Sequence, residues 1–231
     1  MVNRKRVHRL WRAAKLQVLK PRRRRRRAGV SASAPTQAAH PGHVWTDDFV
    51  HDACLTGAKL KLLPVVDEFT RECLAIEVAT ALPAVRVIGV LDRLFAAHGA
   101  PASLRSDTGP EFVAHAIQGW LARHQAATRS IEPGCPWQHG CGERFNSSLR
   151  DECLNMQAFA SVASVAEARI QIERFRRQYN EERPHSRLGY RTPAEFKADW
   201  LADQSNPSHT ARSYHLPWPK NLGAPHSQSG K

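Results

Sequence analysis

The chain has 231 residues, 42% of them hydrophobic, which suffices for one sizeable core and does not require a second. Its five cysteines are odd in number and scattered, and no signal-peptide pattern precedes them, which argues against a secreted, disulfide-stabilised protein. No segment approaches the roughly 18 consecutive apolar residues that a membrane-spanning helix needs. We therefore expect a soluble cytoplasmic protein built around one domain.

The formal net charge of +13 comes from the N-terminus. The first 27 residues contain 13 lysines and arginines and no acid, whereas the rest of the chain carries 21 basic and 21 acidic residues. Such an arm favours nucleic acid, because each neutralised phosphate releases condensed counterions; the alternative is a solvated, self-repelling tail. The DNA contacts expected in the arm are six consecutive arginines, Arg22, Arg23, Arg24, Arg25, Arg26 and Arg27.

Composition and periodicity divide the chain into four regions. Residues 1–20 predict a short basic amphipathic helix, which looks like the last helix of a larger bundle, and residues 21–43 predict a basic flexible linker. Residues 44–200 predict the folded core, and residues 201–231 predict a flexible polar tail.

Within the core, apolar runs bounded by turn residues predict strands, and apolar residues at helical spacing predict helices. The expected strands cover residues 45–53, 59–69, 71–80, 102–106 and 127–132. The expected helices cover residues 83–98, 110–126, 143–154 and, as the last major one, 165–179. The first three strands should form an antiparallel meander, and the whole predicts a mixed α/β domain with helices on both faces of its sheet.

Three acids occupy positions where acids are otherwise hard to explain. Asp48 lies inside the first expected strand, Asp107 directly follows a later strand, and Glu143 opens a helix. Carboxyl ends of neighbouring strands meet at one sheet edge, and carboxylates that converge there need a cation to offset their repulsion. Hard oxygen ligands suit Mg²⁺ or Mn²⁺, and two such ions serve displacement at phosphorus. The alternative is ordinary strand-end and turn acids, with Glu143 a helix-start charge.

The spacing of these acids leaves 58 residues between Asp48 and Asp107 and 35 between Asp107 and Glu143. With this spacing, the chain resembles the bacterial insertion-sequence transposases of the OrfB type, which carry a retroviral-integrase-like core. The segments that carry the resemblance are residues 45–50 (WTDDFV), 66–72 (VDEFTRE), 106–112 (SDTGPEF), 133–138 (PGCPWQ), 143–146 (ERFN), 149–155 (LRDECLN), 179–186 (YNEERPHS) and 192–193 (TP).

The resemblance implies a ribonuclease-H-like fold over residues 44–200, with a mixed five-stranded sheet flanked by helices. It implies that Asp48, Asp107 and Glu143 are the catalytic residues and metal ligands of a DDE transposase that cuts and joins DNA with Mg²⁺, for which Mn²⁺ can substitute, and with two ions. It further implies a bacterial, nucleoid-associated protein that works as a homo-oligomer on transposon ends and target DNA. Residues 1–20 then resemble a partial helix-turn-helix, so an upstream-frame partner protein is a further expectation.

Only one of the neighbouring acids Asp47 and Asp48 can belong to the site, because strand alternation sends adjacent side chains to opposite faces of the sheet. The family pattern favours Asp48. We interpret three further acids near the motifs as structural: Asp67, Glu111 and Asp151.

Three further residues outside the arm are candidates for DNA contact. Asn146 and Arg150 share a helix face with Glu143, where they line either the DNA side of the site or a solvated helix edge. Arg183 lies in a basic turn after the last expected helix, where it contacts phosphates or caps the helix.

Three positions depart from the family pattern: Thr108 and His139 stand where it usually has Asn, and Arg144 stands where it usually has a small Ser. None of these changes removes an expected metal ligand, but they leave open whether this copy is active. Two alternatives therefore accompany the transposase reading: a catalytically silent DNA-binding remnant, and a hydrolytic nuclease of the same fold.

Overall fold

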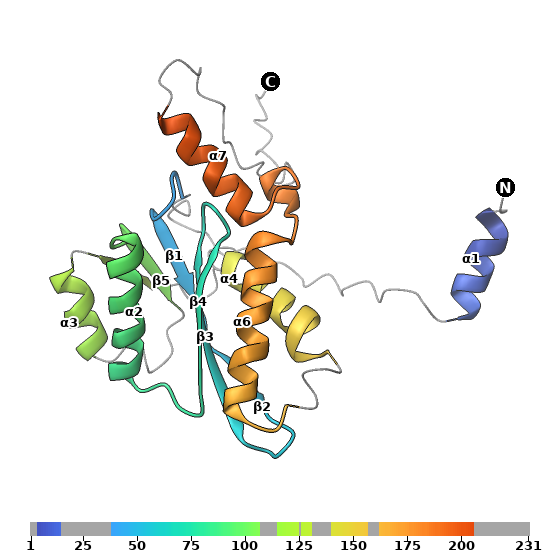
Figure 1. Cartoon of the computed structure of the whole chain (residues 1–231), viewed down its shortest axis with the longest axis horizontal. Helices are drawn as coiled ribbons and strands as arrows, with labels where there is room; N and C mark the ends of the chain where they lie inside the picture. The colour runs from blue at the N-terminus through green and yellow to red at the C-terminus, as the bar shows by residue number, and fades with distance from the viewer. Residues whose placement is uncertain are drawn as a thin grey trace, which may run out of the picture. The chain divides into compact units, whose positions relative to one another are not determined.

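The computed structural model describes residues 4–14, 38–106, 115–124, 126–130, 140–156 and 162–205 (Figure 1). The chain divides into two compact units, Met1–Ser33 and Ala34–Lys231. In the first unit, helix α1 (Arg4–Ala13) lies within the expected basic amphipathic segment; the arginine run at residues 22–27 lies outside the described residues. Among the described helices, none combines the length and the hydropathy that crossing a membrane requires.

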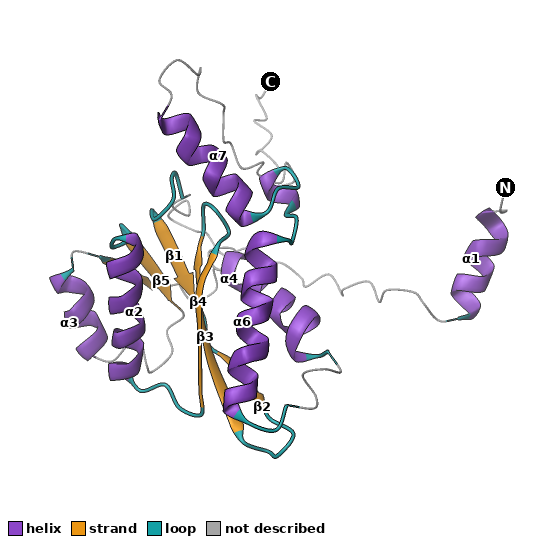
Figure 2. Cartoon of the chain, viewed as in Figure 1, coloured by secondary structure: helices purple, strands orange, loops and turns teal. Residues whose placement is uncertain are grey.

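The second unit is built on one mixed sheet (Figure 2). β3 pairs antiparallel with β1, β2 and β4, whereas β5 pairs in parallel with β1 and with β6. The expected antiparallel meander is therefore confirmed, and two parallel strands extend it. The strands are β1 (Val44–Asp47), β2 (Val50–Ala53), β3 (Lys59–Asp67), β4 (Cys73–Ala79), β5 (Ser103–Ser106) and β6 (Ala127–Ser130).

The strand expected over residues 45–53 is broken into β1 and β2. Both pieces pair with β3 in one continuous register, so they occupy a single strand position in succession and the sheet has five positions. Continuing that register places Pro64 opposite Asp48, and a proline has no N–H to donate to the ladder. Asp48 accordingly lies just past the carboxyl end of β1 and not inside a strand.

Helices α2 (Ala84–His98) and α3 (His115–Arg123) cover one face of the sheet (Figure 2). The apolar stripe of α2 packs with α3 against inward-facing residues of β1, β3 and β5. α2 ends at Gly99, whose φ of +80° glycine adopts without steric cost. The residues that α2 buries are Val87, Val90, Leu91, Leu94 and Phe95.

The other face is covered by α4 (Gly140–Leu149) and α6 (Val165–Glu181). α4 begins three residues before the expected helix start and continues directly into a π-helix, η2 (Arg150–Leu154). Ser164 caps the start of α6: its hydroxyl accepts a hydrogen bond from the Glu167 N–H, a role at helix N-termini that serine favours. The sheet thus carries a separate apolar core on each face.

Beyond α6, a short 3-10 helix η3 (Ser186–Leu188) leads to helix α7 (Pro193–Ser205). The expectation that residues 165–179 form the last major helix is therefore wrong, and helix continues five residues into the expected tail. The start of α7 is a capping box: Thr192 Oγ1 accepts from the Glu195 N–H, and Glu195 Oε2 accepts from the Thr192 N–H. The Thr192-Pro193 motif therefore starts a helix, with proline at its first position.

Candidate active site

Two neighbouring acids at the end of β1 point to opposite faces of the sheet. Asp47 is buried, and its Oδ2 accepts a hydrogen bond of 2.9 Å from Ser106 Oγ on β5. Asp48 is partly buried, and its Oδ2 accepts a hydrogen bond of 2.8 Å from Asn146 Nδ2 on α4. This is the outcome that strand alternation predicts, and Asp48 is the acid on the α4 side.

Helix α4 places Glu143 on the same stripe as Asn146, because the two residues are three positions apart. The helix is fixed to the sheet by Phe145 and Leu149, both fully buried. The ring of Phe145 packs edge-on against Tyr179 of α6, with 4.8 Å between centroids. Glu143 itself is exposed, so its carboxylate is accessible on the stripe that reaches Asp48.

Asp107, the second acid of the expected triad, lies outside the described residues, as do Thr108 and His139. In sequence Asp107 follows Ser106, the last residue of β5, whose Cα pairs with that of Asp47 in the parallel ladder. Within the described ranges, no group of three His, Cys, Asp or Glu side chains is arranged to hold a metal ion. The structure thus locates two of the three expected acids, one just past the end of β1 and one on α4.

The residues expected to contact DNA have distinct surroundings. Asn146 is buried and donates to Asp48, a contact that the helical spacing did not reveal. Arg150 is exposed and begins η2; π-helical turns are rare and recur at functional sites. Arg183 donates to both carboxylate oxygens of Glu152, at 2.9 and 2.8 Å from its Nε, so part of its charge is neutralised within the chain.

The motif at residues 66–72 forms a turn organised by Asp67. Its Oδ1 accepts from the N–H groups of Phe69 and Thr70 and from the Thr70 hydroxyl, and its Oδ2 accepts from the Gly42 N–H at 2.6 Å. The expectation that Asp67 is structural agrees with these contacts. Asx-type turns explain why this position needs a short carboxylate.

The same motif contributes Glu68 to a buried ion pair that the sequence did not single out. Arg105 Nη1 on β5 donates to Glu68 Oε1 and Oε2 at 2.8 and 2.9 Å, and both side chains are less than 10% exposed. The pair connects the β3–β4 turn to the strand that leads to Asp107. It therefore holds the carboxyl end of β5 in place beside β1.

Comparison with known proteins rests on the sequence as well as on the fold. Residues 38–136 and 124–193 match two families, each described as an integrase core domain. A 31.7 kDa protein of insertion element IS407 from Burkholderia multivorans is 40% identical over 208 residues, which cover 89% of this chain and 73% of that protein. The chain belongs to the insertion-sequence transposases with an integrase-like core.

A second insertion-element relative is longer than the chain, and a solved structure shares its fold. A 39.2 kDa protein of insertion element IS476 from Xanthomonas euvesicatoria is 39% identical over 205 residues, and the chain spans 58% of its length. The HTLV-2 integrase catalytic core domain, 18% identical, superposes with a TM-score of 0.52 over 68% of this chain and 97% of that one. The expected ribonuclease-H-like fold is therefore confirmed.

Of the three departures from the family pattern, only Arg144 lies among the described residues. It is exposed on α4, next to Glu143 in sequence but turned about 100° around the helix. Arg144 lines a pocket that also contains Arg71 and Arg187, away from the Asp48 side of the helix.

Proposed function

We propose that this transposase cuts DNA and joins the resulting 3′ end to a target strand at a site formed by Asp48, Asp107 and Glu143. The observation that carries the proposal is the hydrogen bond from Asn146 to Asp48, which fixes α4 at the carboxyl end of β1. Glu143 lies one turn earlier on the same stripe of α4. Asp107 follows β5, the parallel neighbour of β1.

The donor set fits a hard divalent cation. Carboxylates at a sheet edge, one of them oriented by an amide, are the oxygen ligands that Mg²⁺ takes in phosphoryl-transfer sites, and Mn²⁺ accepts the same ligands. The HTLV-2 integrase core, whose fold this chain shares, was solved in complex with magnesium. A pair of ions held by the three acids would activate the attacking oxygen and stabilise the departing one.

The reaction has two displacements of one kind. In cleavage, water loses a proton and forms a bond to phosphorus while the phosphorus–O3′ bond breaks, and the departing O3′ takes a proton. This leaves a 3′-hydroxyl on the element end and a 5′-phosphate on the flanking strand. In the joining step that hydroxyl loses its proton and forms a new bond to a target phosphorus, while the target P–O3′ bond breaks. In both steps Asn146 keeps the Asp48 carboxylate in one orientation. The entropy cost of orienting this metal-binding carboxylate is therefore met during folding and not during the reaction.

The remaining partners belong to this proposal as well. Arg150 and the arginine run at residues 22–27 would contact the DNA backbone and contribute salt-dependent affinity. We further propose that the protein acts as a homo-oligomer on the two element ends, within the bacterial nucleoid, and that an upstream-frame protein supplies recognition of the ends.

The test is a strand-transfer assay with labelled duplexes that carry the element ends and a supercoiled plasmid as target. The wild type should give joined products with Mg²⁺ or Mn²⁺ and none with EDTA. Asp48→Asn and Glu143→Gln should each abolish joining while keeping the thermal unfolding midpoint in the absence of metal. Asp47→Asn is the matched control, because its amide oxygen can still accept from Ser106, and it should keep joining activity.

The other outcomes identify the alternatives. Nicked plasmid without joined product would indicate a hydrolytic nuclease. Salt-dependent duplex binding without Mg²⁺ or Mn²⁺ stabilisation would indicate a silent remnant. Loss of joining in Asp47→Asn but not in Asp48→Asn would refute the assignment of the first acid.

A further inference from the structure

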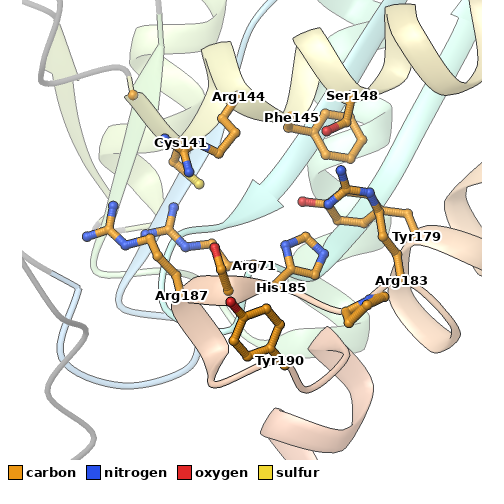
Figure 3. A pocket seen from close by; sticks show the side chains of 13 residues that line it. Arg71, Cys141, Arg144, Phe145, Ser148, Tyr179, Arg183, His185, Arg187 and Tyr190 are labelled. Atoms are coloured by element: carbon orange, nitrogen blue, oxygen red, sulfur yellow. The ribbon is translucent and has the colours of Figure 1, made fainter. Parts of the chain in front are cut away.

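A pocket with a volume of about 340 Å³ opens between α4, the turn after α6 and the turn that joins β3 to β4 (Figure 3). Its volume is at the lower end of the range for ligand sites, roughly 300–1,000 Å³. Four guanidinium groups line this arginine pocket: Arg71, Arg144, Arg183 and Arg187.

The arginine pocket holds more positive charge than its own acids offset. Arg183 is paired with Glu152, but within the described part of the chain no ion pair is found for Arg71, Arg144 or Arg187. The Nε atoms of Arg71 and Arg187 are buried and have no hydrogen-bond partner among the described residues. Buried donors without acceptors are costly, so the pocket suits a ligand that supplies acceptor oxygens.

Burial and the positive charges of the pocket arginines lower the pKa values of two pocket residues. Burial and the nearby charges of Arg71 and Arg144 lower the pKa of Arg187. Burial, followed by the charges of Arg183 and Arg71, lowers the pKa of His185 to about 4, so this pocket histidine is neutral at pH 7. A bound anion would offset the repulsion that Arg187 and His185 experience from the neighbouring arginines.

Backbone conformation marks the same pocket. Among the described residues, Arg71 and Tyr190 are the two non-glycine residues with positive φ, at 64° and 63°, and both line the pocket. Left-handed conformations of such bulky residues are strained and concentrate at functional sites. Tyr190 is 77% exposed as a residue, so it presents an aromatic side chain to solvent beside the arginines.

The arginine pocket is separate from the Asp48 side of α4. With about 100° per residue, Arg144 and Ser148 lie on a different flank of the helix from Glu143 and Asn146. One helix thus serves two sites. The family pattern usually has a small serine at position 144, so this chain adds a guanidinium to the pocket.

We propose that the arginine pocket binds a phosphate group of the DNA backbone other than the one that is cut. Guanidinium forks match phosphate oxygens in geometry and charge, and an exposed tyrosine ring can stack on a base or cover the sugar. The choice of DNA as the source of the phosphate rests on the function proposed above.

The test is the salt dependence of duplex binding by the full chain, measured by fluorescence anisotropy. The NaCl concentration is varied between roughly 50 and 200 mM, a range over which phosphate contacts strongly change the affinity. Arg144→Gln and Arg187→Gln should each reduce the slope of log K against log[NaCl] by about 0.9, the value for one lost phosphate contact. Arg93→Gln removes the same charge from α2, which covers the opposite face of the sheet, and should leave the slope unchanged. Inorganic phosphate should raise the unfolding temperature of the wild type more than that of Arg187→Gln.

Two results would overturn the proposal. Unchanged slopes in both pocket variants would exclude a DNA contact, and if inorganic phosphate still stabilised the wild type, the pocket would be a site for free anions. Equal slope changes in Arg93→Gln would mean that overall charge, not the pocket, sets the affinity. If the wild type joins no DNA but the two pocket slopes fall, the proposed catalysis fails while the phosphate site stands.

Discussion

Asn180, in the motif at residues 179–186, ties α6 to the start of β4. Its Oδ1 accepts from the Cys73 N–H at 2.8 Å, and its Nδ2 donates to the Cys73 carbonyl at 2.9 Å. A register shift in the β3–β4 pairing falls beside Cys73, where a bulge disrupts the ladder. The side chain of Asn180 therefore supplies hydrogen bonds that a regular ladder would otherwise provide.

Replacing Asn180 with alanine should destabilise the fold by an amount that these contacts determine. The Cys73 carbonyl keeps a donor, Arg176 Nη1 at 3.1 Å, but the fully buried Cys73 N–H loses its acceptor. An unsatisfied buried donor costs about 1–3 kcal/mol, and the vacated space adds to this, so we expect about 2–4 kcal/mol in all. For a chain of this size that corresponds to a fall of roughly 5–15 °C in unfolding temperature.

Urea denaturation followed by tryptophan fluorescence measures this loss. The matched control is Gln178→Ala, which removes an exposed amide from the same helix and should change stability by less than about 0.5 kcal/mol. If both variants unfold at the same urea concentration, Asn180 does not hold β4. A fall in DNA affinity at unchanged stability would instead make Asn180 a DNA contact.

Three further outcomes follow from single contacts. Asn146→Ala removes the donor to Asp48 Oδ2 and should lower strand transfer roughly 10- to 100-fold and weaken Mg²⁺ stabilisation in a thermal titration. Arg105→Met breaks the buried ion pair with Glu68 and should cost about 3–5 kcal/mol in urea denaturation. The neutral, low-pKa form of His185 predicts that stability falls as pH drops from about 6.5 towards 4, by at most about 1.4 kcal/mol per pH unit, because the unfolded state binds the proton first. His185→Gln should flatten that pH profile of urea midpoints.

Controls separate these effects from general damage. Ser147→Ala, at an exposed neighbouring position, should leave strand transfer intact; a loss equal to that of Asn146→Ala would argue against a specific role for the amide. The double variant Glu68→Gln/Arg105→Met should recover part of the stability, since it removes the buried charge as well. An unchanged pH profile in His185→Gln would contradict the depressed pKa of His185.

The sequence alone predicts most of the secondary structure and the orientation of the first acid. The alternation of apolar residues in strands and their recurrence about every 3.6 residues in helices are local properties of the sequence. The antiparallel meander, helix α2 and the opposite orientations of Asp47 and Asp48 can therefore be predicted from them. The capping box of α7 was also readable, from Thr192 and Glu195 three residues apart, although the helix was not expected.

Contacts between distant elements were decided only by the tertiary structure. Asn146 and Asp48 are 98 residues apart, and Asn180 and Cys73 are 107 apart; both pairs depend on how α4 and α6 dock on the sheet. The break that ends β1 at Asp47 follows the register with β3, in which Pro64 lies opposite Asp48.

The arginine pocket shows the same division between local and long-range information. Each of its guanidinium groups comes from a segment whose local pattern explains that segment alone: a turn, a helix flank or a 3-10 helix. The charge density at a site depends on which segments pack against one another. The periodicity of a single segment does not contain that information. The sequence therefore determined the folded elements and the acids they carry, while the docking of α4 and α6 on the sheet decided what those residues contact.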